Sequence, residues 1–127
     1  MPDYDAKQFS PPAPVATVTV CTRDHTSAVS DVPMVIDSGS DTTLIPQTYA
    51  ERIGLRGEGE EILVAFDGSA STAKVVVADM VFLGRIYRGE FPLIDDTVGI
   101  LGRNILNHLS LVLDGPRLKW REEHTPG

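Results

Sequence analysis

The sequence has a single cysteine, Cys21, among its 127 residues, which excludes an internal disulfide and any metal site built from several cysteines. Such sparse cysteine suits a reducing compartment. No motif places a histidine beside Cys21, so we interpret it as a buried strand residue rather than a nucleophile. The N-terminus also lacks a basic region followed by an apolar signal core, and we expect a cytoplasmic protein that is not exported.

Basic residues are few, with 11 Lys and Arg against 18 Asp and Glu, for a net charge of −7. No basic run could neutralise a phosphate backbone, and no apolar run approaches the roughly 20 residues that span a bilayer. We therefore expect no nucleic acid and no membrane partner. His25, His108 and His124 lack metal-ligand spacing, and Asp95-Asp96 lacks further spaced oxygen ligands, so we expect no metal and no cofactor.

A hydrophobic fraction of 42% is typical of a globular protein of this length. We expect one domain over residues 15–120, preceded by a proline-rich arm over residues 1–14 that is extended or loose, and followed by a polar tail over residues 121–127.

The pattern of apolar residues predicts a mostly β domain with two short helices. Many short strands at this spacing indicate a closed or folded-over sheet. The strands are expected at 15–21, 32–36, 62–66, 73–77, 80–83, 85–87, 90–94 and as a pair around a turn within 111–120; the helices are expected at 47–53 and 103–109. Asp67-Gly68 between two apolar runs is a hairpin signal.

An acidic residue ends one of the apolar runs, where Pro33–Ile36 leads directly into Asp37-Ser38-Gly39. Burying a carboxylate costs several kcal/mol unless it is paired or hydrogen-bonded. Asp37 therefore belongs either to an ordinary polar turn or to a catalytic site.

Three segments in order carry a resemblance to a known family: Val35–Ser40, Phe66–Ser71 and Ile100–Leu106. They are similar to the Asp-Thr/Ser-Gly signature, the flap hairpin and the Gly-Arg-Asn segment of the retropepsins, the retroviral-type aspartic proteases. The resemblance covers roughly residues 15 to 120. It implies a retropepsin-like closed β-barrel, the acid protease fold, formed by a single-domain protomer with two short helices and a flap.

The resemblance also implies a homodimer that hydrolyses peptide bonds, with Asp37 of each chain activating one water. Such a pair shares a proton. Gly39 would permit the tight turn and Ser38 would bond across the dimer. A Ser40 hydroxyl donated to the outer carboxylate oxygen would favour the ionised form, so we predict an acidic pH optimum.

The same resemblance places an extended peptide between the floor and the flaps, with hydrophobic side chains around the scissile bond. The expected substrate-binding residues are Ser40, Asp41, Ala65, Phe66, Gly68, Ser69, Val98 and Ile100. Arg103 is expected to brace the catalytic turn through an ion pair with Asp41. Two Asp67 side chains at the flap tips would repel at high pH, which also favours activity at low pH.

Two other functions remain open. The chain could be a catalytically inactive retropepsin-like dimer that binds peptides or assembles a complex. Alternatively, Asp37 could form a glycosidase-type acid pair with another carboxylate of its own chain. The sequence also leaves open whether the chain termini or the hairpin within 111–120 hold the dimer.

Overall fold

The computed structural model describes residues 3–57, 59–64 and 67–124. Its strands are β1 (Tyr4–Asp5), β2 (Ala13–Cys21), β3 (Ala28–Ile36), β4 (Ile45–Pro46), β5 (Glu60–Val64), β6 (Ala70–Phe82), β7 (Arg85–Ile94), β8 (Gly99–Leu101), β9 (Leu111–Asp114) and β10 (Lys119–Glu122). The helices are α1 (Gln47–Arg52) and α2 (Arg103–Leu106), with a 3-10 turn at Gly115–Arg117. The prediction of a mostly β domain with two short helices is confirmed.

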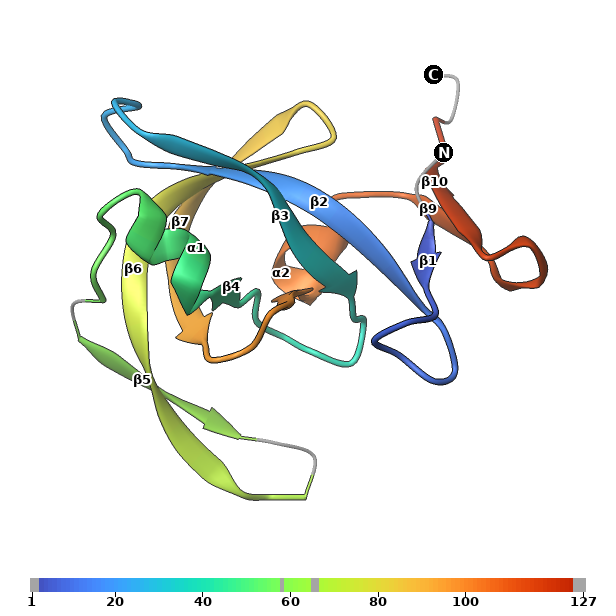
Figure 1. Cartoon of the computed structure of the whole chain (residues 1–127), viewed down its shortest axis with the longest axis horizontal. Coiled ribbons are helices and arrows are strands. Elements are labelled where there is room, and N and C mark those ends of the chain that lie inside the picture. Colours follow the sequence, from blue (N-terminus) through green and yellow to red (C-terminus); the bar gives the residue numbers. More distant parts are fainter. Residues whose placement is uncertain (1–2, 58, 65–66, 125–127) are drawn as a thin grey trace.

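One eight-stranded sheet forms the body of the domain, in the order β4-β7-β6-β2-β3-β8 with β1 and β5 attached at its sides (Figure 1). Strands β9 and β10 form a separate hairpin. Within the described residues, a bridge between Leu44 and Ile100 joins the two ends of the sheet, through two backbone hydrogen bonds of 2.9 Å each. The strand pairing does not show the closed barrel that we expected, because a single bridge, and not a ladder, lies between the segments of β4 and β8.

Alternation along β2 explains how the core forms. Ala16, Val18 and Val20 are all buried, and the residues between them are less buried, as expected for a strand with one face on the core. They pack with Met34, Met80, Leu101, Ile105 and other buried side chains of the same chain. The only tryptophan, Trp120, is buried against this core, and its indole N–H donates to the Val15 carbonyl at 3.0 Å.

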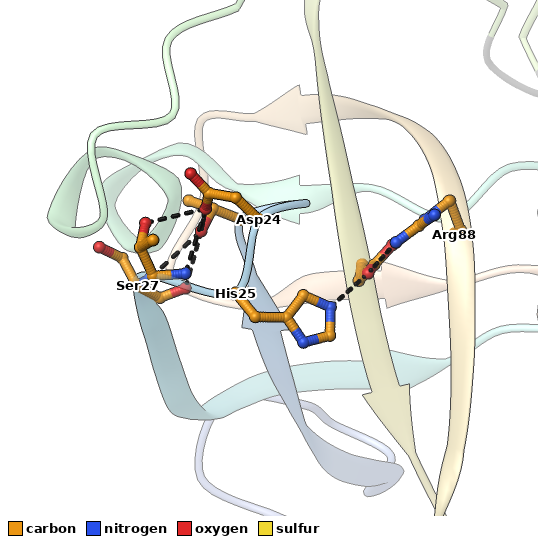
Figure 2. Close-up of polar contacts among 7 residues, drawn as sticks. Asp24, His25, Ser27 and Arg88 are labelled. Atoms are coloured by element: carbon orange, nitrogen blue, oxygen red, sulfur yellow. Dashed lines mark hydrogen bonds and ion pairs between the residues drawn. The ribbon is translucent and has the colours of Figure 1, made fainter.

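The strands β6 and β7 are longer than predicted. The two strands expected over 73–77 and 80–83 form one continuous strand, which carries the buried Asp79 in its C-terminal half. Arg88 on β7 donates two hydrogen bonds to Asp79, of 2.9 and 3.0 Å, and the His25 ring nitrogen lies 2.7 Å from Asp79 Oδ2. His25 and Arg88 point toward one another across the sheet (Figure 2). These hydrogen bonds, that of Arg88 first, hold the pKa of Asp79 well below its ordinary value. The cluster fixes the β2–β3 loop onto the sheet.

Of the two forms expected for the N-terminal segment, extended or loose, the structure shows the extended one at both ends of the segment, where residues 4–5 pair with residues 13–14. Strand β1 pairs with the start of β2, and the Tyr4 N–H donates to the Leu118 carbonyl at 3.0 Å. Prolines do not prevent this arrangement, because proline is compatible with extended backbone at the edge of a sheet. None of the helices in the described part of the chain is long and apolar enough to cross a bilayer.

Candidate active site

Asp37 directly follows β3, and the neighbouring strand fixes its position. Strands β3 and β8 pair in parallel, with Ile36 beside Leu101, and the Asp37 N–H donates to the Leu101 carbonyl at 3.0 Å. The side chain is half-buried. One of its carboxylate oxygens accepts the Gly39 N–H at 2.9 Å, which fixes the orientation of the acid.

The turn that follows Asp37 is closed by its own hydrogen bonds. The Ser40 N–H donates to the Asp37 carbonyl at 3.2 Å, and the Ser40 hydroxyl donates to the Thr42 carbonyl at 2.7 Å. The prediction that this hydroxyl donates to the Asp37 carboxylate is therefore wrong in the single chain. The Thr42 carbonyl, two residues ahead in the same tight turn, accepts this hydrogen bond instead.

Thr43 is a structural residue of the site that the sequence analysis missed. Its side chain is fully buried, its hydroxyl donates to Asn104 Oδ1 at 2.6 Å, and it accepts the Gly102 N–H at 3.0 Å. The hydroxyl thereby ties the end of the catalytic turn to α2. A threonine in a polar stretch gives no signal of this role, because its partners lie about sixty residues further along the chain.

Arg103 holds the turn after Asp37, as predicted, but it contacts a backbone carbonyl of that turn and not the Asp41 carboxylate. Its guanidinium donates to the Ser38 carbonyl at 2.7 Å, and its backbone N–H donates to the Ser40 carbonyl at 2.8 Å. Asp41 instead accepts the Thr42 hydroxyl at 3.1 Å. No ion pair joins Asp41 to Arg103 in the described residues, so that prediction is wrong. The carbonyl lies within reach of the start of α2, whereas Asp41 is exposed to solvent.

Gly102 allows this close approach. A side chain at this position would overlap the Thr42 carbonyl, which lies directly against the glycine. A glycine is therefore required where α2 meets the catalytic turn.

The turn forms one wall of a cleft of about 520 Å³, and the β5–β6 hairpin forms another. The cleft is lined by Asp37, Gly39, Ser40, Asp41, Thr42, Leu44, Glu61, Ile62, Leu63, Val64, Ser69, Ser71 and Ile100. Of the predicted site residues, six are thus brought together here. Val98 lines a neighbouring pocket, while Ser38 and Gly68 are exposed outside this lining. Ala65 and Phe66 lie outside the described residues.

The β5–β6 hairpin stands out from the body of the domain (Figure 1). Its strands pair from Glu60 with Lys74 to Val64 with Ala70. Ile62 and Val64 are 69% and 71% exposed, an unusual state for two large apolar side chains on one short strand. Both line the cleft, so the hairpin offers an apolar surface to whatever occupies it.

Near the tip of the hairpin, hydrogen bonds from Ser69 lower the pKa of Asp67, the hydroxyl having the larger effect and the backbone N–H, at 2.9 Å, the smaller. No group of three or more His, Cys, Asp or Glu side chains in the part of the chain described here could hold a metal ion.

Comparisons with known proteins agree with this geometry. The model of the aspartyl protease family matches residues 17–105, a span that includes the acid turn, the hairpin and most of α2. Among solved structures, the EIAV protease in complex with the inhibitor HBY-793 is similar in fold, with a TM-score of 0.55 and 21% sequence identity over 76% of this chain and 86% of that one. A search of curated proteins found no significant match.

Proposed function

Because the chain belongs to the aspartyl protease family, we propose that it is an aspartic endopeptidase that works as a homodimer. The placement of Asp37 supports this proposal: a half-buried carboxylate on an anchored turn, in a cleft bordered by an apolar hairpin. Each chain supplies one such turn, whereas this chemistry needs two carboxylates. A second copy brings its own Asp37 beside the first across a two-fold axis.

In the dimer the two Asp37 side chains share one proton, because two ionised carboxylates at contact distance repel each other. The ionised side chain takes a proton from a water held between them, and the water oxygen attacks the carbonyl carbon of the peptide. The protonated side chain donates to the carbonyl oxygen, and a proton then passes to the leaving amine nitrogen. Since one carboxyl must keep its proton, activity is highest at acidic pH.

The substrate is an extended peptide that lies between the catalytic turn and the β5–β6 hairpin. Backbone hydrogen bonds to such a hairpin give affinity, and pockets for side chains give preference. The exposed Ile62 and Val64 on the hairpin favour substrates with hydrophobic residues around the scissile bond. Arg103 acts indirectly, by holding the Ser38 carbonyl and with it the turn.

Cleavage of a peptide library between about pH 4 and pH 6 tests the proposal. We expect cleavage by the wild type and none by Asp37→Asn, which keeps the size of the side chain and removes its acid. Peptide binding without cleavage at any pH would instead identify an inactive peptide-binding module.

A second candidate function follows from the other acids of the cleft. Asp41 and Glu61 line it together with Asp37, and an acid pair within one chain could hydrolyse glycosides. Mixing equal amounts of wild type and Asp37→Asn distinguishes the two arrangements. If both acids of a dimer are needed, random exchange leaves about one quarter of the dimers active. Activity of about one half of that of pure wild type at the same total protein concentration would instead show that each chain works alone.

A further inference from the structure

A separate pocket lies at the base of the β5–β6 hairpin. It measures about 460 Å³ and is formed by α1, the loop from Gly54 to Gly57, Lys74 on β6 and Leu93 on β7. The described lining residues of this pocket and of the acid cleft do not overlap. We infer that the pocket binds a short peptide with free ends, and this inference rests on the proposed function for the source of that peptide.

Helix α1 supplies the acidic part of the lining. Gln47 and Glu51 are four residues apart, so their side chains lie on the same face of the helix. The Gln47 side-chain amide donates to Glu51 Oε1 at 3.0 Å, which orients the carboxylate. Because an ionised carboxylate has acceptor sites for several donors, Glu51 can also accept hydrogen bonds from the ammonium group of a ligand.

The loop after α1 supplies the basic part of the lining, together with β6. Its direction is fixed by a Schellman motif, in which the backbone N–H groups of Gly54 and Leu55 each donate to a carbonyl of α1 at 3.0 Å. The loop then passes so close to β6 that a side chain at Gly57 would overlap Lys74. This close packing brings the guanidinium-bearing Arg56 and the ammonium-bearing Lys74 into one pocket.

The chemistry of the lining defines the ligand. Arg56 and Lys74 can bind a carboxylate, and Glu51 can bind an ammonium group. The half-buried Leu55 and the buried Leu93 offer apolar contacts. The pocket volume lies within the range of about 300–1,000 Å³ that is usual for small-molecule sites. A free dipeptide with aliphatic side chains has all three features, whereas a segment inside an intact protein has neither charged end.

The position of the pocket relates its ligand to the hairpin. Lys74 is the last residue of β6 that pairs with β5, and Leu93 belongs to β7, which pairs with the next part of β6. A ligand that contacts both residues therefore stabilises this arrangement of the hairpin relative to the body of the domain. Under the proposed function, a peptide released by cleavage would lower kcat with little change in KM, because it acts from outside the acid cleft and slows exchange at the hairpin.

Titration calorimetry with leucyl-leucine tests the site, in the Asp37→Asn background so that the probe stays intact. The free dipeptide is compared with its N-acetylated and its C-amidated forms, each of which lacks one charge. We expect either cap to weaken binding by about fivefold or more. Glu51→Gln should remove the penalty of the N-acetyl cap alone, and the double variant Arg56→Gln/Lys74→Met should remove the penalty of the amide cap alone.

Arg52→Gln is the matched control, because Arg52 also lies on α1 but its guanidinium lies over the Tyr49 ring, 4.5 Å from the ring centroid and outside the lining. It should bind all three forms as its parent does, and thermal unfolding shows whether each variant is folded. Failure to bind the free dipeptide at about 10 mM, or equal binding of all three forms, would overturn the inference. A wild type that cleaves no peptide would instead contradict the proposed function, and the binding result in Asp37→Asn would stand apart from it.

Discussion

The buried hydroxyl of Thr43 joins the turn after Asp37 to α2 through two hydrogen bonds, one donated to Asn104 and one accepted from Gly102. Thr43→Val keeps the shape of the side chain but leaves the Gly102 N–H without its partner in a buried position. An unpaired buried polar group costs about 1–3 kcal/mol, so we expect the free energy of unfolding to fall by about 2 kcal/mol. Urea denaturation measures the loss. Thr43→Ser retains the hydroxyl and should lose much less; equal losses for both variants would contradict this role.

Because Arg103 contacts the Ser38 carbonyl and not Asp41, substitutions of Arg103 and Asp41 should have different effects. Arg103→Ala removes the donor that holds Ser38, so we expect lower kcat/KM and weaker dimerisation, with an effect on folding of only about 1 kcal/mol. Asp41→Asn should not weaken the dimer in the same way, because Asp41 and Arg103 are not paired. Sedimentation and peptide cleavage of both variants check the difference. Equal losses in Arg103→Ala and Asp41→Asn would instead support the ion pair between Asp41 and Arg103 that was expected from the sequence.

At the scale of the elements, the stability of β6 depends on the hydrogen bonds that His25 and Arg88 make with Asp79. The pKa of Asp79 is lowered in the folded protein, so its contribution to stability is complete above the unfolded value of 3.8 and declines as the pH falls below it. We expect Asp79→Asn to be less stable than wild type at about pH 5 and to lose less stability on going to about pH 2. Urea denaturation at the two pH values tests this; parallel losses in both proteins would contradict it.

The flap tip is a second element with a pH-dependent prediction. The pKa of Asp67 is lowered by Ser69, so the carboxylate is already charged between about pH 4 and pH 6. Repulsion between two charged tips would then be constant in this range, so we expect the acidic optimum to come from the Asp37 pair rather than from the tips. We expect Asp67→Asn to change activity by about fivefold at most, the effect of roughly 1 kcal/mol between two exposed charges, without moving the pH optimum. A shifted optimum would show that the tips titrate within this range.

Local patterns predicted elements well where one face of a strand meets the core. Alternation in β2 and the Asp67-Gly68 turn indicated a strand and a hairpin, and both are found. The sequence did not indicate that β6 runs unbroken through Asp79, because the partners that make this acid tolerable, His25 and Arg88, come from other elements. For the same reason the catalytic turn was recognised from its motif, while its hydrogen bonds were partly mispredicted.

At the scale of the whole molecule, the core is completed within one chain. Trp120 and its buried neighbours need no residue from a second copy, whereas the proposed active site does. We therefore expect dilution to reduce specific activity with no change in the emission of Trp120, the only tryptophan. Cleavage and fluorescence measured over the same dilution series test this. A parallel change in both would mean that the chain folds only as it assembles.

The ends of the chain were the part of the molecule that composition described least well. Prolines suggested an extended or loose start, and in the structure Tyr4 and the residues around it pair with β2 and contact the segment before β10. Such pairing is decided by distant segments, which a residue-by-residue pattern does not contain. The sequence likewise gave no sign that the sheet would be joined by one bridge at Leu44 rather than by a ladder.

Strand β6 changes its pairing partner part of the way along its length. Residues 70–74 pair with β5, and from Val75 onwards the strand pairs with β7 instead. The outer part of the hairpin, β5 with residues 70–74, is therefore joined to the ladder with β7 at the peptide link between Lys74 and Val75, where Gly57 packs closely against Lys74. Substitutions in this outer part leave the ladder between β6 and β7 unchanged; under the proposed function, a new substrate preference would require exchange of the hairpin alone.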